Sequence, residues 1–314
     1  MTLPILQAPI GSMASPELAA AVCEAGGLGQ LSFTWKNAGQ QESDMEKMRL
    51  LTKRNWGANF VLDFPVEEQL ARALDRGVGL VSFFWGDGSE HLPSITLAGA
   101  VSAQVVGTVD EARRAADAGF DIVVAQGAEA GGHVRGTMGT LALVPQVVDA
   151  VSPLPVVAAG GIADRRGVAA AFALGAAGVW VGTRFLAARE ADVHPVYRDE
   201  VLRATGDRAI RCEAFDIGWP AAPHRVLVNS TVRAWTNAGR PRAPHRPGEA
   251  QQVALRPDGS GISRYHFAAP HSGMSGDVEA MALYAGEGVG LVREVEPAAT
   301  IVADLARGIP ELAG

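Results

Sequence analysis

The chain has 314 residues, 48% of them hydrophobic, which allows one large α/β domain with an appended segment. A net charge of −7 argues against a general nucleic-acid or anionic-membrane binder, which would need a basic face. Cys23 and Cys212 lack metal or C-x-x-C spacing, and the N-terminus shows no signal-peptide pattern. We therefore expect free thiols, a cytoplasmic location and no membrane span. A monomer and a homodimer both remain open.

Eight apolar segments with strand character follow one another within residues 1–190, with helical patterns between them. The strands are predicted at residues 4–10, 28–33, 56–62, 79–85, 101–106, 122–124, 155–159 and 178–181. The intervening helices are predicted at residues 16–25, 42–52, 65–76, 91–100, 108–118, 141–151 and 164–174, the fourth of them weakly. This alternation is typical of a (β/α)₈ TIM barrel, an α/β fold.

A doubly wound sheet is the competing architecture, and it normally carries its phosphate-binding glycine cluster after the first strand. Here that strand ends in a single glycine, Gly11, and the glycine pairs follow the sixth and seventh strands, which favours the barrel. Beyond the barrel at 1–190 we expect a smaller, mainly helical cap or insertion at 191–275. A C-terminal helical segment, 276–314 with a helix at 274–292, is expected to pack back on the barrel.

The stretch DIVVAQGAEAGGHVRG, residues 121–136, joins a buried strand to a glycine-rich loop. The carboxyl ends of barrel strands are where this fold places its chemistry. Glycines such as Gly131 and Gly132 let the backbone approach a flat ligand closely. His133 is the only side chain of the stretch that titrates near neutral pH, so it is the candidate catalytic residue, against the alternative of an ordinary loop histidine. The other six histidines show no metal-binding spacing, and we expect most of them at the surface.

Two glycine-containing pairs follow the seventh and eighth strands, Gly160-Gly161 and Gly182-Thr183. Barrels commonly bind a phosphate between these loops through backbone N–H groups. Asn59 and Gln126 lie at strand ends, where primary amides can bond a flavin edge. These features predict FMN rather than a dinucleotide, because a second phosphate-binding turn is missing from the sequence.

Segments found in order along the chain resemble the nitronate monooxygenases, formerly called 2-nitropropane dioxygenases. They are QAPIGS at 7–12, GANF at 57–60, GAEAGGH at 127–133, VVAAGGI at 156–162, VWVGTRF at 179–185 and GMSGDVEAMALYAGEGVGLV at 273–292. The region 195–270 is poorly covered. The resemblance implies an FMN-bearing barrel with His133 as the catalytic histidine. The expected cofactor-binding residues are Ala8, Pro9, Ile10, Asn59, Gln126, Gly131, Gly132, Gly160, Gly161, Trp180, Val181, Gly182 and Thr183.

Two features depart from the family pattern. Glu287 stands where the family usually has glutamine, which would add a charge at the cofactor or substrate edge, and Tyr284 lies three residues before it. We take both residues as candidate substrate contacts. The segment WGDGSEHLPS at 85–94 is shorter and more polar than the family pattern, which affects the substrate-side wall.

The resemblance implies FMN-dependent oxidation of alkyl nitronates by dioxygen to carbonyl compounds and nitrite. His133 would either take the α proton of a neutral nitroalkane or orient a preformed nitronate, and the sequence leaves both roles open. One alternative is an NAD(P)H-dependent flavin reductase of quinones or enoyl thioesters in the same superfamily. The other is a barrel that binds a phosphorylated ligand without turnover.

Overall fold

The computed structural model describes residues 1–310, and its main feature is a single sheet of eight parallel strands. The strands are β1 (Ile5–Gln7), β2 (Gln30–Ser32), β3 (Gly57–Val61), β4 (Leu80–Phe84), β5 (Val101–Val106), β6 (Ile122–Gln126), β8 (Val156–Ala159) and β9 (Gly178–Val181). Their order is β1-β9-β8-β6-β5-β4-β3-β2. A parallel bridge between Leu6 and Leu28 brings the edge strands together, and the Gln7 N–H donates to the Leu28 carbonyl at 2.9 Å. The expected (β/α)₈ barrel is confirmed.

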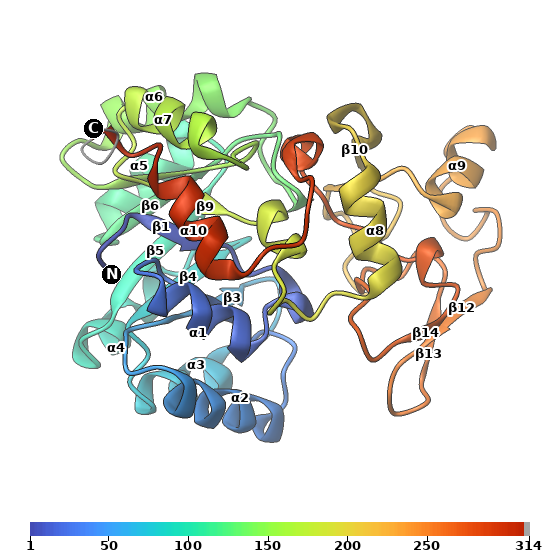
Figure 1. Cartoon of the computed structure of the whole chain (residues 1–314), viewed down its shortest axis with the longest axis horizontal. Helices are drawn as coiled ribbons and strands as arrows, with labels where there is room; N and C mark the ends of the chain where they lie inside the picture. Colours follow the sequence, from blue (N-terminus) through green and yellow to red (C-terminus); the bar gives the residue numbers. More distant parts are fainter. Residues whose placement is uncertain (311–314) are drawn as a thin grey trace.

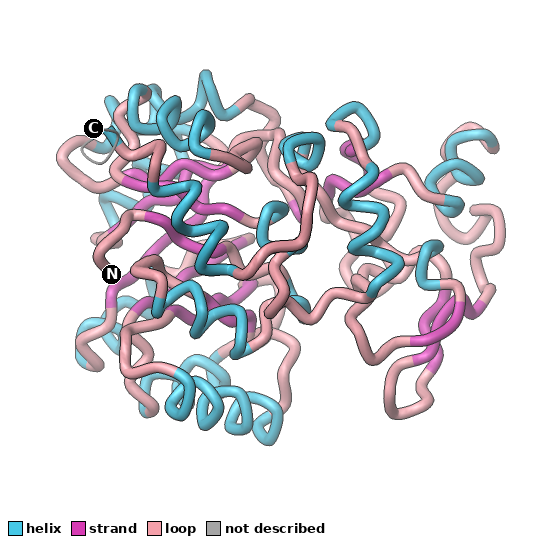
Figure 2. The backbone as a smooth tube through the Cα atoms, in the orientation of Figure 1, coloured by secondary structure: helices cyan, strands magenta, loops and turns pink. Residues whose placement is uncertain are grey.

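Helices surround this sheet, as Figures 1 and 2 show. They are α1 (Pro16–Glu24), α2 (Ala38–Leu51), α3 (Glu67–Asp75), α4 (Leu92–Leu97), α5 (Val109–Ala118), α6 (Thr140–Val151), α7 (Arg165–Ala173) and α10 (Ala298–Ala306). Local sequence sets their ends: the Ser15 hydroxyl accepts from the Leu18 N–H at 3.0 Å, ahead of Pro16 in the first turn of α1. The last helix, α10, packs against α1 and α7 and so takes the place of an eighth barrel helix.

Every second side chain of a barrel strand points inward, and these side chains fill the interior. Ligands can therefore bind only at the ends of the barrel. One buried cluster fills the interior, with Leu6, Leu28, Leu80, Ala103, Val124, Val157, Ala159 and Trp180. Neighbouring strand residues belong instead to the core between strands and helices, and Val179 and Val181 are two of them. Trp180 and Val181 therefore face opposite sides of the same strand.

Residues 183–297 form an insertion between β9 and α10, drawn in yellow to orange-red in Figure 1. It contains α8 (Pro195–Arg203), α9 (Ser230–Asn237), β10 (Ala209–Cys212), β11 (His224–Leu227), β12 (Gln252–Leu255), β13 (Gly261–Ser263) and β14 (Ser275–Gly276). Loops make up much of it (Figure 2). The region 191–275 is less helical than expected: α8 and α9 are its α-helices, and short strands of two antiparallel sheets, joined by loops, make up most of the rest.

The predicted helix at 274–292 is also wrong. This segment contains β14 and two 3₁₀ turns, Val278–Ala280 and Glu287–Leu291. Glycines interrupt it for a packing reason: a Cβ on Gly286 would lie 2.7 Å from the Glu129 carbonyl oxygen, and one on Gly288 would lie 2.8 Å from that of Gly161. The backbone at 284–290, which we call the strap, thus runs against the loops that follow β6 and β8.

Candidate active site

A cavity of about 1000 Å³ opens at the carboxyl ends of the barrel strands, between the barrel and the insertion. Most of the predicted site residues meet there although they are distant in sequence. Those that line the cavity are Ala8, Pro9, Ile10, Asn59, Gln126, Gly131, Gly132, His133, Gly160, Gly161, Trp180, Gly182, Thr183 and Tyr284. Val181 and Glu287 do not line it. For Val181 the reason is the strand alternation, which points its side chain toward the helices.

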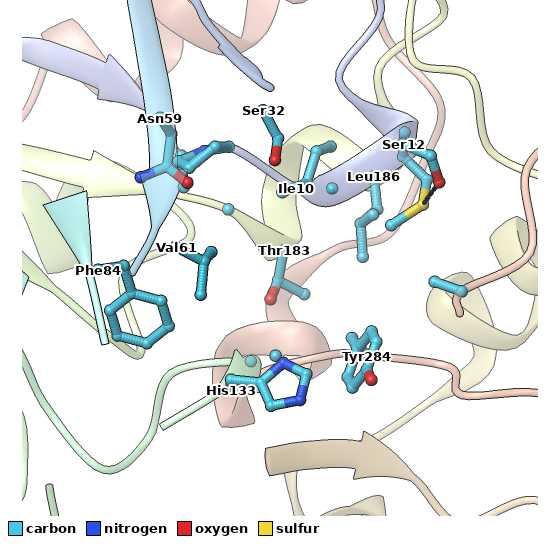
Figure 3. Close-up of a pocket in the computed structure, with 18 of the residues that line it drawn as sticks. Ile10, Ser12, Ser32, Asn59, Val61, Phe84, His133, Thr183, Leu186 and Tyr284 are labelled. Atoms are coloured by element: carbon cyan, nitrogen blue, oxygen red, sulfur yellow. Dashed lines mark hydrogen bonds between the residues drawn. The ribbon is translucent and has the colours of Figure 1, made fainter. Parts of the chain in front are cut away.

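His133 lies on a two-residue strand, β7 (Gly132–His133), that the sequence did not predict. This strand pairs antiparallel with β11 of the insertion, with His133 opposite His224. The indole of Trp219 stacks on the His133 ring at a centroid distance of 3.8 Å and an angle of 30°. Figure 3 shows the imidazole beside Tyr284 and facing the same space as Thr183. His133 thus belongs to a barrel loop, and Trp219 and β11 of the insertion fix the position of its ring.

The electrostatic surroundings keep His133 neutral at physiological pH. Burial and, to a lesser degree, His224 hold its pKa well below the ordinary value of 6.5. Its Nε2 is buried and has no hydrogen-bond partner within residues 1–310. His224 contrasts with it: Nδ1 bonds the Ala222 carbonyl at 2.9 Å, and Nε2 accepts from the Phe215 N–H at 3.2 Å. Of this pair, His133 is the imidazole left to act on a ligand.

A glycine-lined wall faces His133. Gly160 and Gly161 have φ values of +106° and +71°, a left-handed conformation that favours glycine. The Thr183 hydroxyl accepts from the Gly286 N–H at 2.9 Å, which leaves its proton free to donate. The short 3₁₀ helix Thr183–Ala187 begins at this wall, and the first N–H groups of a helix lack intrahelical partners. This wall can hold a phosphate.

The predicted amides complete the inner half of the cavity. The Asn59 Nδ2 donates to the Ser82 hydroxyl at 3.0 Å, so its Oδ1 is turned to accept from a ligand. The Gln126 Nε2 donates to the His133 carbonyl at 3.3 Å and ties the end of β6 to the catalytic candidate. Ligand pockets commonly span roughly 300–1,000 Å³, so this cavity can take a flat phosphorylated cofactor and a small substrate together.

Glu287, a candidate substrate contact, has its side chain outside the cavity lining. Its Oε1 lies 2.9 Å from Nη1 of Arg225, so the additional charge is paired outside the cavity lining. The Arg225 guanidinium also donates to the carbonyls of Ala128 at 2.8 Å and Ala209 at 2.7 Å. The bond from Arg225 to Ala128 fastens the loop after β6 to the insertion, and the ion pair with Glu287 lies within the insertion. Tyr284 does line the cavity, but its hydroxyl donates to the Phe267 carbonyl at 2.7 Å.

Glu129, the carboxylate of the glycine-rich loop, is also structural. It accepts from the Thr140 N–H at 2.8 Å and from the Thr140 hydroxyl at 2.9 Å, which caps the start of α6. Gly131 packs so closely on the strap that a Cβ would lie 2.4 Å from the Gly286 nitrogen. Backbone packing by itself therefore requires glycine at position 131.

Sequence reasoning missed the outer half of the cavity, which comes mostly from the insertion. Its lining includes Trp35, Lys36, Trp219, Arg256, His266, Phe267 and His271. The expectation that most other histidines lie at the surface fails for the insertion, because His224 is fully buried and His266 and His271 line the cavity. No local pattern in the sequence singles out these residues, because contacts between distant segments bring them to the cavity.

Comparison with known proteins identifies relatives of the whole chain. A family model described as nitronate monooxygenase matches residues 1–68 and 63–308. A putative monooxygenase of Mycobacterium tuberculosis is 42% identical over 203 residues, covering 65% of this chain and 51% of that protein. The match thus spans about half the length of that relative.

Two solved structures are similar over nearly the whole chain. The nitroalkane oxidase of Streptomyces ansochromogenes is 32% identical, with a TM-score of 0.81, and the alignment covers 99% of this chain and 96% of that one. FabK from Thermotoga maritima is 29% identical, with a TM-score of 0.80, and the alignment covers 100% of this chain and 94% of that one.

Within residues 1–310, no helix combines the length and apolarity needed to cross a membrane.

Proposed function

Because the chain belongs to the nitronate monooxygenase family, we propose that it oxidises alkyl nitronates with dioxygen to carbonyl compounds and nitrite. It is a flavin-dependent oxidoreductase, and FMN is the flavin we assign to it. The observation that carries the proposal is the neutral His133, whose ring faces a cavity walled by phosphate-compatible glycines. We place the enzyme in the cytoplasm, in keeping with two buried free thiols, Cys23 and Cys212.

The residues present fit FMN. Gly160, Gly161, Gly182 and Thr183 would hold the phosphate, and Asn59 and Gln126 would bond the polar edge of the ring. Ala8, Pro9 and Ile10 would lie against the ring from the end of β1, with Gly131, Gly132 and Trp180 as further contacts. Bound FMN supplies the electron transfer and the oxygen chemistry.

His133 has two uses in this reaction, and a neutral imidazole can serve both. Its unprotonated nitrogen can take the proton from the carbon next to the nitro group of a neutral nitroalkane. Its N–H can donate to a nitronate oxygen and hold the anion. The aromatic rings of Trp219 and Tyr284 surround the imidazole and limit its contact with water, which strengthens either interaction.

Anaerobic mixing of the purified protein tests the proposal. We expect a yellow protein with about one FMN per chain, released on denaturation, whose flavin absorbance is bleached by a nitronate. Recovery of FAD, or of no flavin after attempted reconstitution, would contradict the cofactor assignment. A flavin that stays oxidised with nitronates would contradict the reaction.

The size of the cavity favours a second candidate, an NAD(P)H-dependent reduction of a quinone or an enoyl thioester. A cavity of about 1000 Å³ with aromatic rings in its outer half has room for a larger substrate than a small nitronate. Flavin bleaching by NADH and not by nitronate in the same experiment would establish this alternative. A flavin reduced by neither would favour a barrel that binds its ligand without turnover.

A further inference from the structure

The outer half of the cavity carries charges that the proposed reaction does not use. Four basic side chains line it: Lys36, which follows β2, and Arg256, His266 and His271 from the insertion. Asp44 and Asp192 line it as well. Whether this half attracts an anion depends on which of these charges are already neutralised.

Two of the basic groups have acidic partners. Lys36 forms an ion pair with Asp44. His271 has its Nδ1 3.8 Å from an Asp192 oxygen, and Asp192 also accepts a hydrogen bond from the Ser272 N–H at 3.1 Å. Lys36 therefore offsets the charge of Asp44. Asp192 keeps its negative charge, because the Ser272 N–H is a neutral donor and the His271 contact is an ion pair only when the imidazole is protonated.

Arg256 differs from them. Its Nη1 contacts two neutral oxygens of its own hairpin, the Ser260 hydroxyl at 3.3 Å and the Gly261 carbonyl at 3.4 Å. Within residues 1–310 it forms no direct ion pair; the nearest charge on its own hairpin is Asp258, which bonds the same Ser260 hydroxyl and whose pKa Arg256 helps to lower. Its guanidinium is always charged and presents several donors in one plane, which matches a carboxylate or a phosphate.

His266 adds a donor whose tautomer is set by the backbone. Its Nδ1 accepts from the Ala268 N–H at 2.9 Å, so the ring proton of the neutral form lies on Nε2. Burial and the nearby Arg256 lower the pKa of His266, which keeps the ring neutral. The ring is held in place by stacking on Phe267 at 5.1 Å and 16°. A fixed N–H thus accompanies the guanidinium in the lining.

Aromatic rings connect this pair to the catalytic candidate. Phe267 lies 6.3 Å from Trp219, the ring that stacks on His133, and 5.4 Å from Trp35. The lining between the two ends is therefore largely flat and apolar. A ligand that fills it would carry an unsaturated or apolar body, with its reacting group at one end and a charged group at the other.

We propose that Arg256 and His266 bind an anionic group, carboxylate or phosphate, at the far end of the substrate that His133 acts on. The inference rests on the proposed function and narrows it to elongated, anionic substrates. The anion is held by a charge-assisted bond to Arg256 and by a neutral bond to His266, with Trp35 and Phe267 beside the body of the molecule.

The test uses Arg256→Gln in the FMN-loaded enzyme with paired nitronates of matched chain length, one ending in a carboxylate and one in a methyl group. Hydrogen bonds to charged groups are usually strong enough that we expect the KM for the carboxylate member to rise about 10- to 100-fold. The kcat and the KM for the methyl member should stay within about 3-fold. Arg293→Gln is the matched control, because Arg293 is exposed and does not line the cavity.

A binding experiment separates this inference from the reaction itself. Adenosine diphosphate and a terminal carboxylate nitroalkane are titrated into the oxidised enzyme, and binding is followed by the flavin spectrum. Weaker binding of either probe in Arg256→Gln, partly restored in Arg256→Lys, supports the anion site and shows which anion it takes. Equal binding to wild type and Arg256→Gln for both probes overturns it, whether or not nitronates are oxidised.

Discussion

The two halves of the cavity are built in different ways. The inner half is made of backbone and short side chains at the ends of barrel strands, and Asn59 there is only 4% exposed. The outer half is made of long and aromatic side chains from loops and the insertion, and Trp35 there is 43% exposed. Rigid backbone suits a fixed cofactor, whereas side chains on an insertion can differ, and so alter substrate preference, without disturbing the cofactor site. Mutations in the inner half should therefore affect FMN binding and the chemical step, and mutations in the outer half should affect substrate binding.

The largest effect is expected for His133→Ala. If His133 removes a proton, kcat/KM with a neutral nitroalkane should fall by about 10²- to 10⁴-fold, the usual range for losing a positioned base. With a preformed nitronate the loss should be much smaller, because no proton has to be removed. Steady-state rates with both substrate forms, at equal FMN content, check this.

The pH profile gives the control. The base form of His133 exists above its pKa, which burial lowers below 6.5. The wild-type rate with nitroalkane should therefore be level at neutral pH and fall as the pH drops through an ionisation below 6.5, which the mutant lacks. Equal losses with both substrates would assign His133 to orientation alone, and no loss would remove it from the mechanism.

Gly182→Asp should damage the cofactor rather than the substrate. Its carboxylate would lie on the wall assigned to the phosphate, and like charges in contact cost several kcal/mol, so FMN affinity should fall by about 10²-fold or more. Gly182→Ala is the matched control: its Cβ would lie 3.4 Å from the Ala8 Cβ and 3.5 Å from the Ile10 Cγ2, both ordinary contacts. Unchanged FMN affinity in a folded Gly182→Asp protein would remove this wall from the phosphate site.

The same division explains what could be predicted from the sequence. The barrel strands and the inner site were predicted because each strand is a local apolar run, and its end is placed by the fold. Asn59, Gln126 and Gly160 come together without any contact between them being visible in the sequence. Val181 was misplaced because neighbouring residues of a strand face opposite sides.

The insertion could not be predicted for the opposite reason, since its structure depends on contacts between distant residues. β7 exists because residues 132–133 pair with β11. Trp219 is held against His133 by a hydrogen bond from its Nε1 to Asp63 at 2.9 Å, across the barrel–insertion boundary. The position of the strap depends on Gly286 and Gly288, whose backbone packs directly against the backbone of the barrel loops. Contacts of this kind, between residues far apart in the sequence, leave no periodic pattern in the local sequence.

Trp219→Leu probes the boundary between the halves, and we expect an intermediate effect. Stacked aromatic pairs contribute about 0.5–1.5 kcal/mol, so kcat/KM should fall by up to about 10-fold. Water would also reach His133, so its pKa should rise toward 6.5 and move the acid limb of the pH profile upward. Trp219→Phe, which keeps an aromatic ring but loses the bond to Asp63, should shift the limb less. If the acid limb of Trp219→Leu stays where it is in the wild type, the stacked indole does not lower the pKa of His133.

The smallest effect is expected for Glu287→Gln, although Glu287 was a candidate substrate contact. The side chain is 45% exposed and pairs with Arg225 outside the cavity lining, and such partly exposed pairs usually contribute no more than about 1 kcal/mol. A glutamine oxygen can still accept from the guanidinium, which keeps its bonds to Ala128 and Ala209. Thermal unfolding and kcat/KM should therefore both stay close to wild type. Arg225→Met, which leaves those two carbonyls without a donor, should destabilise the protein more. A large change in KM for Glu287→Gln, at unchanged stability, would instead indicate that Glu287 contacts the substrate. The strap would then have to move when the substrate binds.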